Sequence, residues 1–391
     1  MNEDRATRYN RRRRWVSTLS VLVTGGLLGA LLVTPGAVSL RDVSHRLIAG
    51  LGLPASSAAL VASYVAILVA LHELVSLPLG FYQGVVLDRR YGLSSQGAIG
   101  WMRDHLKASG VALGLAMPAA MIVYATLRTW PERWWIVSGL IFAGAVVGLT
   151  LLGPVLLLPL FARCIPLQRD ALRERLEALA RRAGTSVVGV YEWQLGERAG
   201  RANAALVGLF GTRRILVSDT LLSTHSDDEI EVVLAHELGH HVHGDIWKTV
   251  ALESAMTLTG LFAAHLALGS LGPALGIAER DDVAGLPLIV LAAGLTSLLF
   301  LPLANAVSRR HERRADRFAL ELTADTEAFL SAMRRLEVQH LAERRPSRMV
   351  RWLFCSHPPV DERIALGEAQ RSLTTSSPCI SLQRSSSAKL Q

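Results

Sequence analysis

The chain has 391 residues, of which half are hydrophobic and only 19% are charged, and its mean hydropathy is +0.32. Soluble domains contain about a quarter charged residues, so this fraction is too small to cover two or three water-exposed domains. Long uncharged stretches alternate with stretches that are rich in arginine. The pattern excludes a disordered chain, a coiled coil and a disulfide-rich secreted domain, and it indicates an integral membrane protein with water-exposed segments.

The formal net charge is +8, which could in principle reflect nucleic-acid binding. The arginines, however, lie beside apolar stretches, so membrane topology explains them and no nucleic-acid partner is expected. The three cysteines, Cys164, Cys355 and Cys379, form no CxxC pair, which excludes a disulfide framework and a cysteine-only metal site. Basic residues Arg11 to Arg14 precede the first apolar run without a convincing cleavage site, so we expect a retained anchor.

Six apolar stretches are long enough to cross a bilayer, which requires about 20 helical residues. They are Trp15 to Val33, Ala58 to Val86, Ala108 to Leu127, Trp134 to Phe161, Trp247 to Leu271 and Val283 to Val307. Their flanks alternate between segments rich in Lys and Arg, which hold 21 such residues, and segments that hold five. Since basic residues accumulate in cytoplasmic loops, both termini and the segment 162–246 are predicted to be cytoplasmic.

The segment 162–246 is the main water-exposed region. Leucines at helical spacing predict an amphipathic helix over Leu167 to Arg182, and β-branched runs predict strands over Val187 to Trp193 and Arg214 to Val217. A further helix is predicted to start near Ser226 or Asp227, which are good N-cap residues, and to run through His240. From Ser308 the chain is predicted to be helical through about Ala342.

The segment VVLAHELGHHVHGD contains the strongest chemical signal, because His236, Glu237 and His240 match the pattern H-E-x-x-H. Residues at i and i+4 share a helix face, so both imidazoles can reach one tetrahedral zinc ion. Glu237 lies beside the first ligand, where it could take a proton from a metal-bound water. The alternative is a polar helix with solvated histidines, but the preceding apolar run and Gly239, which permits close packing, favour the metal site.

Zinc requires a third protein ligand and an open position for water. The metzincin pattern fails, because His243 and Ile246 occupy the places that need Gly and His. A glutamate on a later helix is the remaining common choice. Glu312 and Asp316 lie four residues apart just after the last span, where one could be a ligand and the other could orient a ligand histidine. Alternatively, Glu312 belongs to a surface charge cluster with its neighbouring arginines.

These residues belong to a longer series of motifs that resembles the type I CAAX prenyl endopeptidases, integral membrane zinc proteases of the gluzincin class. The resemblance covers roughly residues 75–370. Besides the zinc helix and SRRHERRAD, it includes LPLGFYQGVVLDRRYGL, PLFARCIPL, NAALVGLFGTRRILVSDTLL and SHPPVDERI, which start at Leu77, Pro159, Asn203 and Ser356. The number and order of the motifs make the resemblance strong, although each motif alone would be weak.

The resemblance implies one Zn²⁺ per chain with His236, His240 and Glu312 as ligands. It also implies that Glu237 is the catalytic base and that Asp316 orients a ligand histidine.

The resemblance further implies that Asn203 and Ala204 bind the substrate backbone beside an edge strand, and that His357 stabilises the oxyanion of the scissile carbonyl. From the residues alone, Asn203 could equally be a turn residue, and His357 a turn histidine before two prolines.

Four polar residues remain outside this scheme. His241 and His243 are interpreted as interfacial residues, because one helix face already holds two ligands. His72 and Glu73 lie inside a predicted span, where ionisable groups are expensive and commonly functional. Since Ser76 stands where a second histidine would be needed, Glu73 is interpreted as cavity-facing or paired and not as a ligand.

The predicted fold is mainly α, a polytopic helical membrane protein with about six spans and a cytoplasmic gluzincin-type zinc protease domain that carries a small β-sheet. Eukaryotic relatives have seven spans, so the N-terminal helix arrangement is expected to differ. The expected segments are a basic N-terminus (1–14), a four-span membrane domain (15–161), the first part of the protease domain (162–246), a membrane hairpin (247–307), the second part of the protease domain (308–372) and a disordered tail (373–391).

The predicted function is zinc-dependent hydrolysis of peptide bonds in peptides or proteins, including lipidated or membrane-associated ones. Two alternatives stay open. One is a heat-shock-type quality-control protease of the membrane, which would cut unmodified chains. The other is a catalytically silent, zinc-stabilised membrane scaffold, although a scaffold would need the ligands and not the base Glu237.

Overall fold

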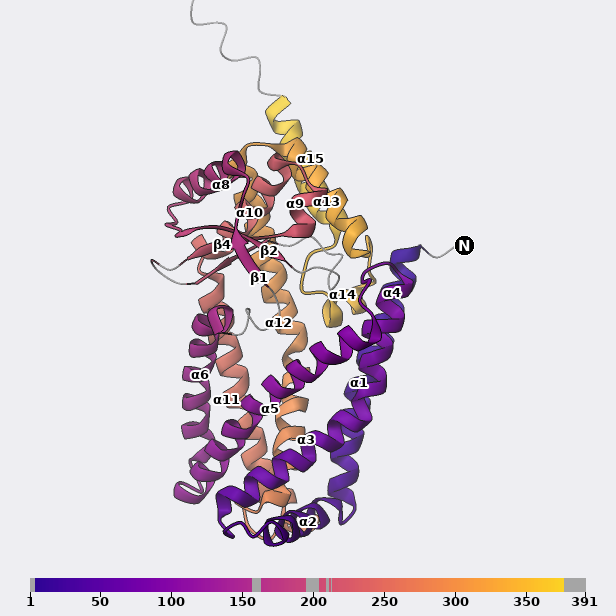
Figure 1. The fold of residues 1–391 in the computed structure, drawn as a ribbon, viewed down its shortest axis with the longest axis vertical. Coiled ribbons are helices and arrows are strands. Elements are labelled where there is room, and N and C mark those ends of the chain that lie inside the picture. Colours follow the sequence, from indigo (N-terminus) through magenta and orange to yellow (C-terminus); the bar gives the residue numbers. More distant parts are fainter. Residues whose placement is uncertain (1–3, 157–162, 195–203, 209–210, 212, 376–391) are drawn as a thin grey trace, which may run out of the picture. The chain divides into compact units, whose positions relative to one another are not determined.

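The computed structural model of the chain describes residues 4–156, 163–194, 204–208, 211 and 213–375 (Figure 1). The fold is mainly helical and divides into two compact units. We call residues 1–10, 162–245 and 305–391 the sheet unit, and residues 11–161 and 246–304 the span unit.

Long apolar helices build the span unit, and they confirm the six predicted spans. They are α1 (Arg5–Val33), α3 (Ser57–Phe81), α5 (Ala98–Thr129), α6 (Trp134–Leu156), α11 (Asp245–Leu271) and α12 (Leu286–Thr323), and both α1 and α12 have residues in each unit. Helix α3 continues through a π-helical turn (Tyr82–Leu87) into α4 (Asp88–Arg90). Short 3₁₀ turns cover Pro273–Leu275 and Val283–Gly285. Phe161, where the fourth span was predicted to end, lies outside the described residues.

One helix of the span unit was not predicted. Helix α2 (Gly36–Gly50) occupies the segment between the first two spans. It is too short to cross a bilayer and packs against α3, where the Tyr64 hydroxyl donates a hydrogen bond to the Ala37 carbonyl (3.3 Å). The core of this unit is large and aromatic, with Tyr64, Tyr124 and Trp134 almost fully buried.

The sheet unit contains a mixed sheet of four strands in the order β1-β2-β4-β3. Strand β2 (Gly189–Gln194) pairs antiparallel with β1 (Arg163–Pro166) and parallel with β4 (Arg214–Ser218), and β3 (Ala204–Val207) pairs antiparallel with β4. Strands β2 and β4 confirm the two predicted strands.

Two local predictions near the start of this sheet were wrong. Strand β1 was not expected, and the amphipathic helix begins at Asp170 instead of Leu167 (α8, Asp170–Arg182). The residues before α8 belong to the sheet or lie next to it: Arg163–Pro166 form β1, and the Leu167 amide donates a hydrogen bond to the Val190 carbonyl of β2 (3.0 Å). The apolar face of helix α8 buries Leu172, Leu176 and Leu179, as the leucine spacing predicts.

Five more helices belong to the described part of the sheet unit. They are α9 (Asp219–Thr224), α10 (Asp227–Val242), α13 (Thr326–His340), α14 (Arg348–Phe354) and α15 (Val360–Thr375). The helix predicted from Ser308 to about Ala342 is in fact divided, because α12 ends at Thr323 and Ala324 adopts a left-handed conformation with φ of 55°. The tail was predicted to start at residue 373, but α15 extends to Thr375; residues 376–391 lie outside the described part of the chain.

Candidate metal centre

Helix α10 presents His236 and His240 on one face. It starts where the sequence predicts, because Ser226 and Glu229 form a reciprocal capping box that satisfies backbone N–H groups of the first turn. Gly239 lets the helix lie close to α12, since a Cβ atom at this position would be 3.1 Å from the Ala315 Cα. The absent side chain therefore allows α12 to approach the histidine face.

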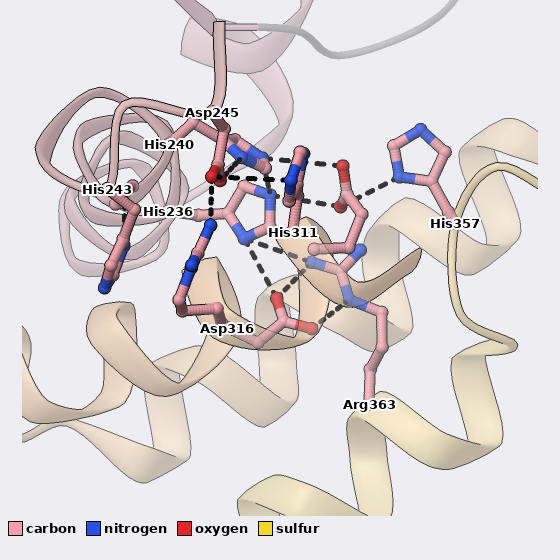
Figure 2. Close-up of polar contacts among 11 residues, drawn as sticks. His236, His240, His243, Asp245, His311, Asp316, His357 and Arg363 are labelled. Carbon is pink, nitrogen blue, oxygen red and sulfur yellow. Dashed lines mark hydrogen bonds and ion pairs between the residues drawn. The ribbon is translucent and has the colours of Figure 1, made fainter. Parts of the chain in front are cut away.

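Glu312 of α12 meets His236 and His240, two of the histidines labelled in Figure 2. The Nε2 atoms of His236 and His240 are 3.2 Å apart, and they lie 3.3 Å and 3.4 Å from the two carboxylate oxygens of Glu312. His236 and Glu312 are buried, and His240 is half-buried. Two imidazole nitrogens and a carboxylate thus converge on one point.

The geometry of this group fits a tetrahedral ion. Zinc bonds to nitrogen and oxygen of about 2.0–2.1 Å place neighbouring ligand atoms about 3.3 Å apart on a tetrahedron. The distance between the two Nε2 atoms (3.2 Å) and the distances from His236 Nε2 to Glu312 Oε2 (3.3 Å) and from His240 Nε2 to Glu312 Oε1 (3.4 Å) lie around this value. In addition, the buried Oε2 atom of Glu312 lies 3.3 Å from His236 Nε2 and 2.9 Å from His357 Nδ1, so several polar atoms are crowded at this point. A divalent cation would satisfy this oxygen and both nitrogens.

Two carboxylates contact the Nδ1 atoms of the ligand histidines, on the side of each ring away from the ligand group. Asp316 Oδ1 lies 2.9 Å from His236 Nδ1, and Asp245 Oδ2 lies 3.1 Å from His240 Nδ1. A carboxylate that accepts the Nδ1 proton fixes the tautomer in which Nε2 carries the lone pair toward the metal. Asp316 was predicted for such a place, whereas the role of Asp245 was missed, although it lies only five residues after His240.

Each of these two carboxylates, Asp316 and Asp245, is itself paired with an arginine. Arg363 of α15 donates two hydrogen bonds to Asp316, at 2.8 Å and 2.5 Å, and Arg314 pairs with Asp245. Burial would lower the pKa of Arg363, but the Asp316 carboxylate outweighs it and raises the pKa. The SHPPVDERI motif contains Arg363, but no residue spacing in the sequence links α15 to α12.

The acidic groups make the site attractive to cations. Burial alone would lower the pKa of His236, but its hydrogen bonds with Asp316 and Glu312 outweigh burial and raise it to about 10. The pKa of His240 is raised for the same reason, through Glu312 and Asp245. The charge that favours a proton on these rings also favours a metal cation.

Glu237 follows His236 on α10 and is partly buried. Burial raises the pKa of its carboxyl group, although the neighbouring His236 and His240 oppose the shift. A carboxylate with a raised pKa is a stronger base, which suits a residue that must accept a proton near neutral pH.

The remaining predicted residues lie at different distances from the centre. His357, in the loop between α14 and α15, places Nδ1 2.9 Å from Glu312 Oε2 and keeps 65% of its side chain exposed. Ala204 is buried in β3, the strand at the end of the described sheet. Asn203 lies outside the described residues. The structure therefore brings His357 to the ligand group and leaves the prediction for Asn203 open.

Two additional histidines, His241 of α10 and His243 directly after this helix, do not belong to the ligand group. His243 turns away from it in Figure 2, contacts the Gly239 carbonyl through Nδ1 (2.7 Å) and packs edge-on against Phe318. Burial and the nearby Arg213 lower the pKa of His241.

Among the described residues, six helices are long and apolar enough to cross a membrane, and an H-E-x-x-H helix meets a glutamate of α12; together these features define an integral membrane metallopeptidase. Comparison with known families agrees. The profile of peptidase family M48 matches residues 166–369, and the profile described as "CAAX prenyl protease N-terminal, five membrane helices" matches residues 2–163. The chain belongs to peptidase family M48. It is a multi-pass membrane metalloendopeptidase that acts on peptides or proteins, and the scaffold alternative is thereby set aside.

Several curated proteins are similar along most of the chain. An uncharacterised metalloprotease, YhfN of Bacillus subtilis, is 27% identical over 78% of this chain and 73% of its own length. CAAX prenyl protease 1 of Saccharomyces cerevisiae is 26% identical over 77% of this chain and 70% of its own. Among solved structures, Ste24p of S. mikatae has the same fold, with a TM-score of 0.77 and 22% identity over 92% of this chain and 87% of that one.

Proposed function

We propose that the chain is a zinc endopeptidase with one Zn²⁺ held by His236, His240 and Glu312. The observation that supports this most strongly is the convergence of the three side chains: the two Nε2 atoms lie 3.2 Å apart, and each lies 3.3–3.4 Å from one oxygen of Glu312. The donor set of two imidazoles and one carboxylate is the one that zinc peptidases use. Bound there, Zn²⁺ would polarise the scissile carbonyl and lower the pKa of the attacking water.

Glu237 accepts the proton of the attacking water and passes it to the leaving amine. Its raised pKa and its place beside the first ligand support this role. Asp316 and Asp245 hold the ligand imidazoles in the correct tautomer, and Arg363 keeps Asp316 ionised.

Substrate residues would be held at two further positions. The exposed His357 turns its ring to the oxyanion of the scissile carbonyl, which in comparable sites contributes a few kcal/mol. Strand β3 lies at the end of the described sheet, so Ala204, together with Asn203, could pair with an extended substrate backbone. In that arrangement the substrate adds a strand to the sheet.

The proposed substrates are prenylated C-terminal peptides of membrane-associated proteins. The supporting observation is that several similar proteins bear the name CAAX prenyl protease 1, over about 70% of their length for the yeast protein. The second candidate is quality-control cleavage of unmodified membrane proteins. The count of basic flanking residues supports an orientation in which the protease domain and both termini are cytoplasmic.

The test uses purified full-length protein in detergent and quenched fluorescent peptides, with and without a farnesylated cysteine. Glu237→Gln should reduce the turnover rate by about 10²–10⁴-fold, the usual contribution of a general base, and should leave the zinc content at one per chain. Glu312→Gln should lose both zinc and activity. Full activity of Glu237→Gln would refute the mechanism, whereas equal cleavage of both peptides would refute only the prenyl preference.

A further inference from the structure

A basic pocket of about 810 Å³ lies in the sheet unit, between the last part of α12 and helix α14. Four arginines line it, Arg309 and Arg313 from α12 and Arg348 and Arg351 from α14, together with Met349 and Trp352. None of these residues belongs to the ligand group of the metal centre. The pocket is therefore a separate feature of the molecule.

Helix α14 is fixed in place by α12. Asn305 donates hydrogen bonds from Nδ2 to the carbonyls of Trp352 and Leu353, at 3.1 Å and 3.0 Å. One turn further along α12, Arg309 donates from Nη1 to the carbonyls of Arg351 and Cys355, at 2.9 Å and 2.6 Å. These carbonyls at the end of α14 would otherwise lack partners. The pocket wall is thus pre-formed, because buried side chains hold its backbone.

The positive charge of the pocket exceeds its negative charge. Glu362 is the carboxylate that faces two of the arginines, at 2.5 Å from Arg351 Nη1 and 3.3 Å from Arg313 Nη2. Arg309 donates hydrogen bonds to backbone carbonyls, which carry no charge and therefore do not neutralise the guanidinium group. Arg348 is exposed and forms no ion pair within the described residues. Glu362 thus faces two of the four guanidinium groups that line the pocket, and the net positive charge that remains would attract an anion.

Large apolar side chains are exposed beside these arginines. Met349 and Trp352 of α14 expose 75% and 63% of their surface. Tryptophan and arginine together are typical of segments that lie at a membrane interface, where the ring contacts the apolar region and the guanidinium contacts phosphate. The arginines of α12 also follow directly after its apolar stretch, which ends near Val307.

We propose that this pocket binds the phosphate headgroup of an anionic phospholipid. A guanidinium group matches phosphate oxygens with two parallel hydrogen bonds, and clusters of basic residues beside a membrane span are typical of anionic-lipid sites. In this arrangement Arg348 and Arg351 contact the headgroup, and Trp352 and Met349 contact the upper part of the acyl chains. The bound lipid would stabilise the position of α14, which directly precedes the loop that contains His357. The inference does not depend on the identity of the metal.

The test compares the full-length protein with two single variants, Arg348→Gln and Arg310→Gln. Arg310 is the matched control, because it is exposed on α12 next to Arg309 and does not line the pocket. Each protein is exchanged into neutral detergent with equal amounts of phosphatidylglycerol and phosphatidylcholine, and retained lipids are counted by native mass spectrometry. One basic residue near a membrane surface contributes about fivefold to the affinity for anionic lipid.

We expect the wild-type protein to retain phosphatidylglycerol in preference to phosphatidylcholine. Arg348→Gln should weaken that retention about fivefold, and Arg310→Gln should change it less than twofold. Trp352→Ala should weaken retention of phosphatidylglycerol without changing the metal content. Equal losses in Arg348→Gln and Arg310→Gln would mean diffuse charge attraction and would overturn the proposal.

A second arm asks whether the pocket binds the substrate instead. Cleavage of one peptide is compared in two forms, with a free and with an amidated C-terminal carboxyl group. If Arg348→Gln raises KM only for the free acid and leaves lipid retention unchanged, the pocket binds the peptide terminus and the lipid proposal is wrong. If KM changes equally little for both forms while lipid retention falls, the proposal stands.

Discussion

Each unit of the molecule contains a glutamate whose carboxylate contacts histidine, and the two clusters differ in the number and arrangement of the imidazoles. In the span unit, Glu73 Oε2 lies 2.9 Å from His105 Nε2, and Oε1 accepts a hydrogen bond from Ser109 (3.0 Å). In the sheet unit, Glu312 faces the Nε2 atoms of two histidines, and these nitrogens also face each other at 3.2 Å. In the first cluster one histidine and one serine contact the carboxylate, whereas in the second cluster two imidazole Nε2 atoms face both the carboxylate and each other.

This difference distinguishes a structural polar cluster from a metal site. The carboxylate of Glu73 is paired, as the sequence interpretation of this residue allows, and the ring of His105 stacks on Trp101. A polar pair between membrane helices is a common way to join them. At the metal centre, Asp316 and Asp245 occupy the Nδ1 atoms, so the Nε2 atoms are directed to a common point. Convergence of two imidazole nitrogens and a carboxylate on one point, and not the mere presence of His and Glu, indicates the metal.

The largest expected effect concerns Asp316→Asn. Loss of this carboxylate should weaken metal binding about 10–100-fold, because His236 loses the group that fixes its tautomer. A competition titration with a chelating dye measures the change. Asp361→Asn, at the surface of α15, is the control and should leave metal affinity unchanged. An unaltered affinity in Asp316→Asn would show that the carboxylate has only a packing role.

The next prediction concerns the contact between α10 and α12. In Gly239→Ala the added Cβ would lie 3.1 Å from the Ala315 Cα, next to Asp316. Such crowding typically costs about 1–3 kcal/mol, and it should also weaken metal binding by separating the ligands. Gly294→Ala is the control, because a Cβ there meets no atom within 4 Å. Chemical unfolding followed by tryptophan fluorescence measures the difference, and equal stability of the two variants would contradict the packing argument.

The span-unit cluster should behave differently. Glu73→Leu removes two side-chain interactions and should reduce the stability of the membrane helices by about 1 kcal/mol. The metal content should remain unchanged, and so should the peptidase rate measured below the unfolding temperature. Thermal unfolding in detergent and metal analysis of the same sample check both parts. Loss of metal from this variant would show that the two clusters are not independent.

The smallest effect concerns the capping box of α10. Burial would raise the pKa of Glu229, but hydrogen bonds from Ser331 and Ser226 and the nearby Arg335 outweigh it and lower the pKa. A lowered folded-state pKa stabilises the protein above the unfolded-state value of about 4.5, and this stabilisation is lost as the pH falls through the folded-state pKa. Glu229→Gln should therefore be about 1 kcal/mol less stable than wild type near neutral pH, and the gap should close in acid. A gap independent of pH would contradict the charge argument.

The sequence predicted the parts of the structure that depend on local pattern. Six spans, the start of α10 and strands β2 and β4 follow from hydropathy, capping residues and β-branched runs. Strand β1 was missed because a four-residue run that contains Arg and Pro has little strand propensity, and only its pairing with β2 defines it. Helix α2 was missed because its apolar residues are mixed with arginines on a short segment.

The candidate site shows the same limit. His236, Glu237 and His240 follow from one short pattern, and the Glu312 and Asp316 pair follows from helical spacing. The contribution of Arg363 depends on α15 packing beside α12, a contact between residues 47 positions apart that no local pattern encodes. Asp245 was visible in the quoted motif, but only the turn after α10 directs it back to His240.

The most direct test of the central claim is X-ray absorption at the zinc edge on the purified full-length protein, together with its metal content. The account predicts one zinc per chain, with nitrogen and oxygen ligands at about 2.0–2.1 Å and the scattering pattern of two imidazoles. In Glu312→Gln the zinc should be lost while the helical content is kept. A sulfur ligand, an imidazole count other than two, or full zinc binding by Glu312→Gln would contradict it.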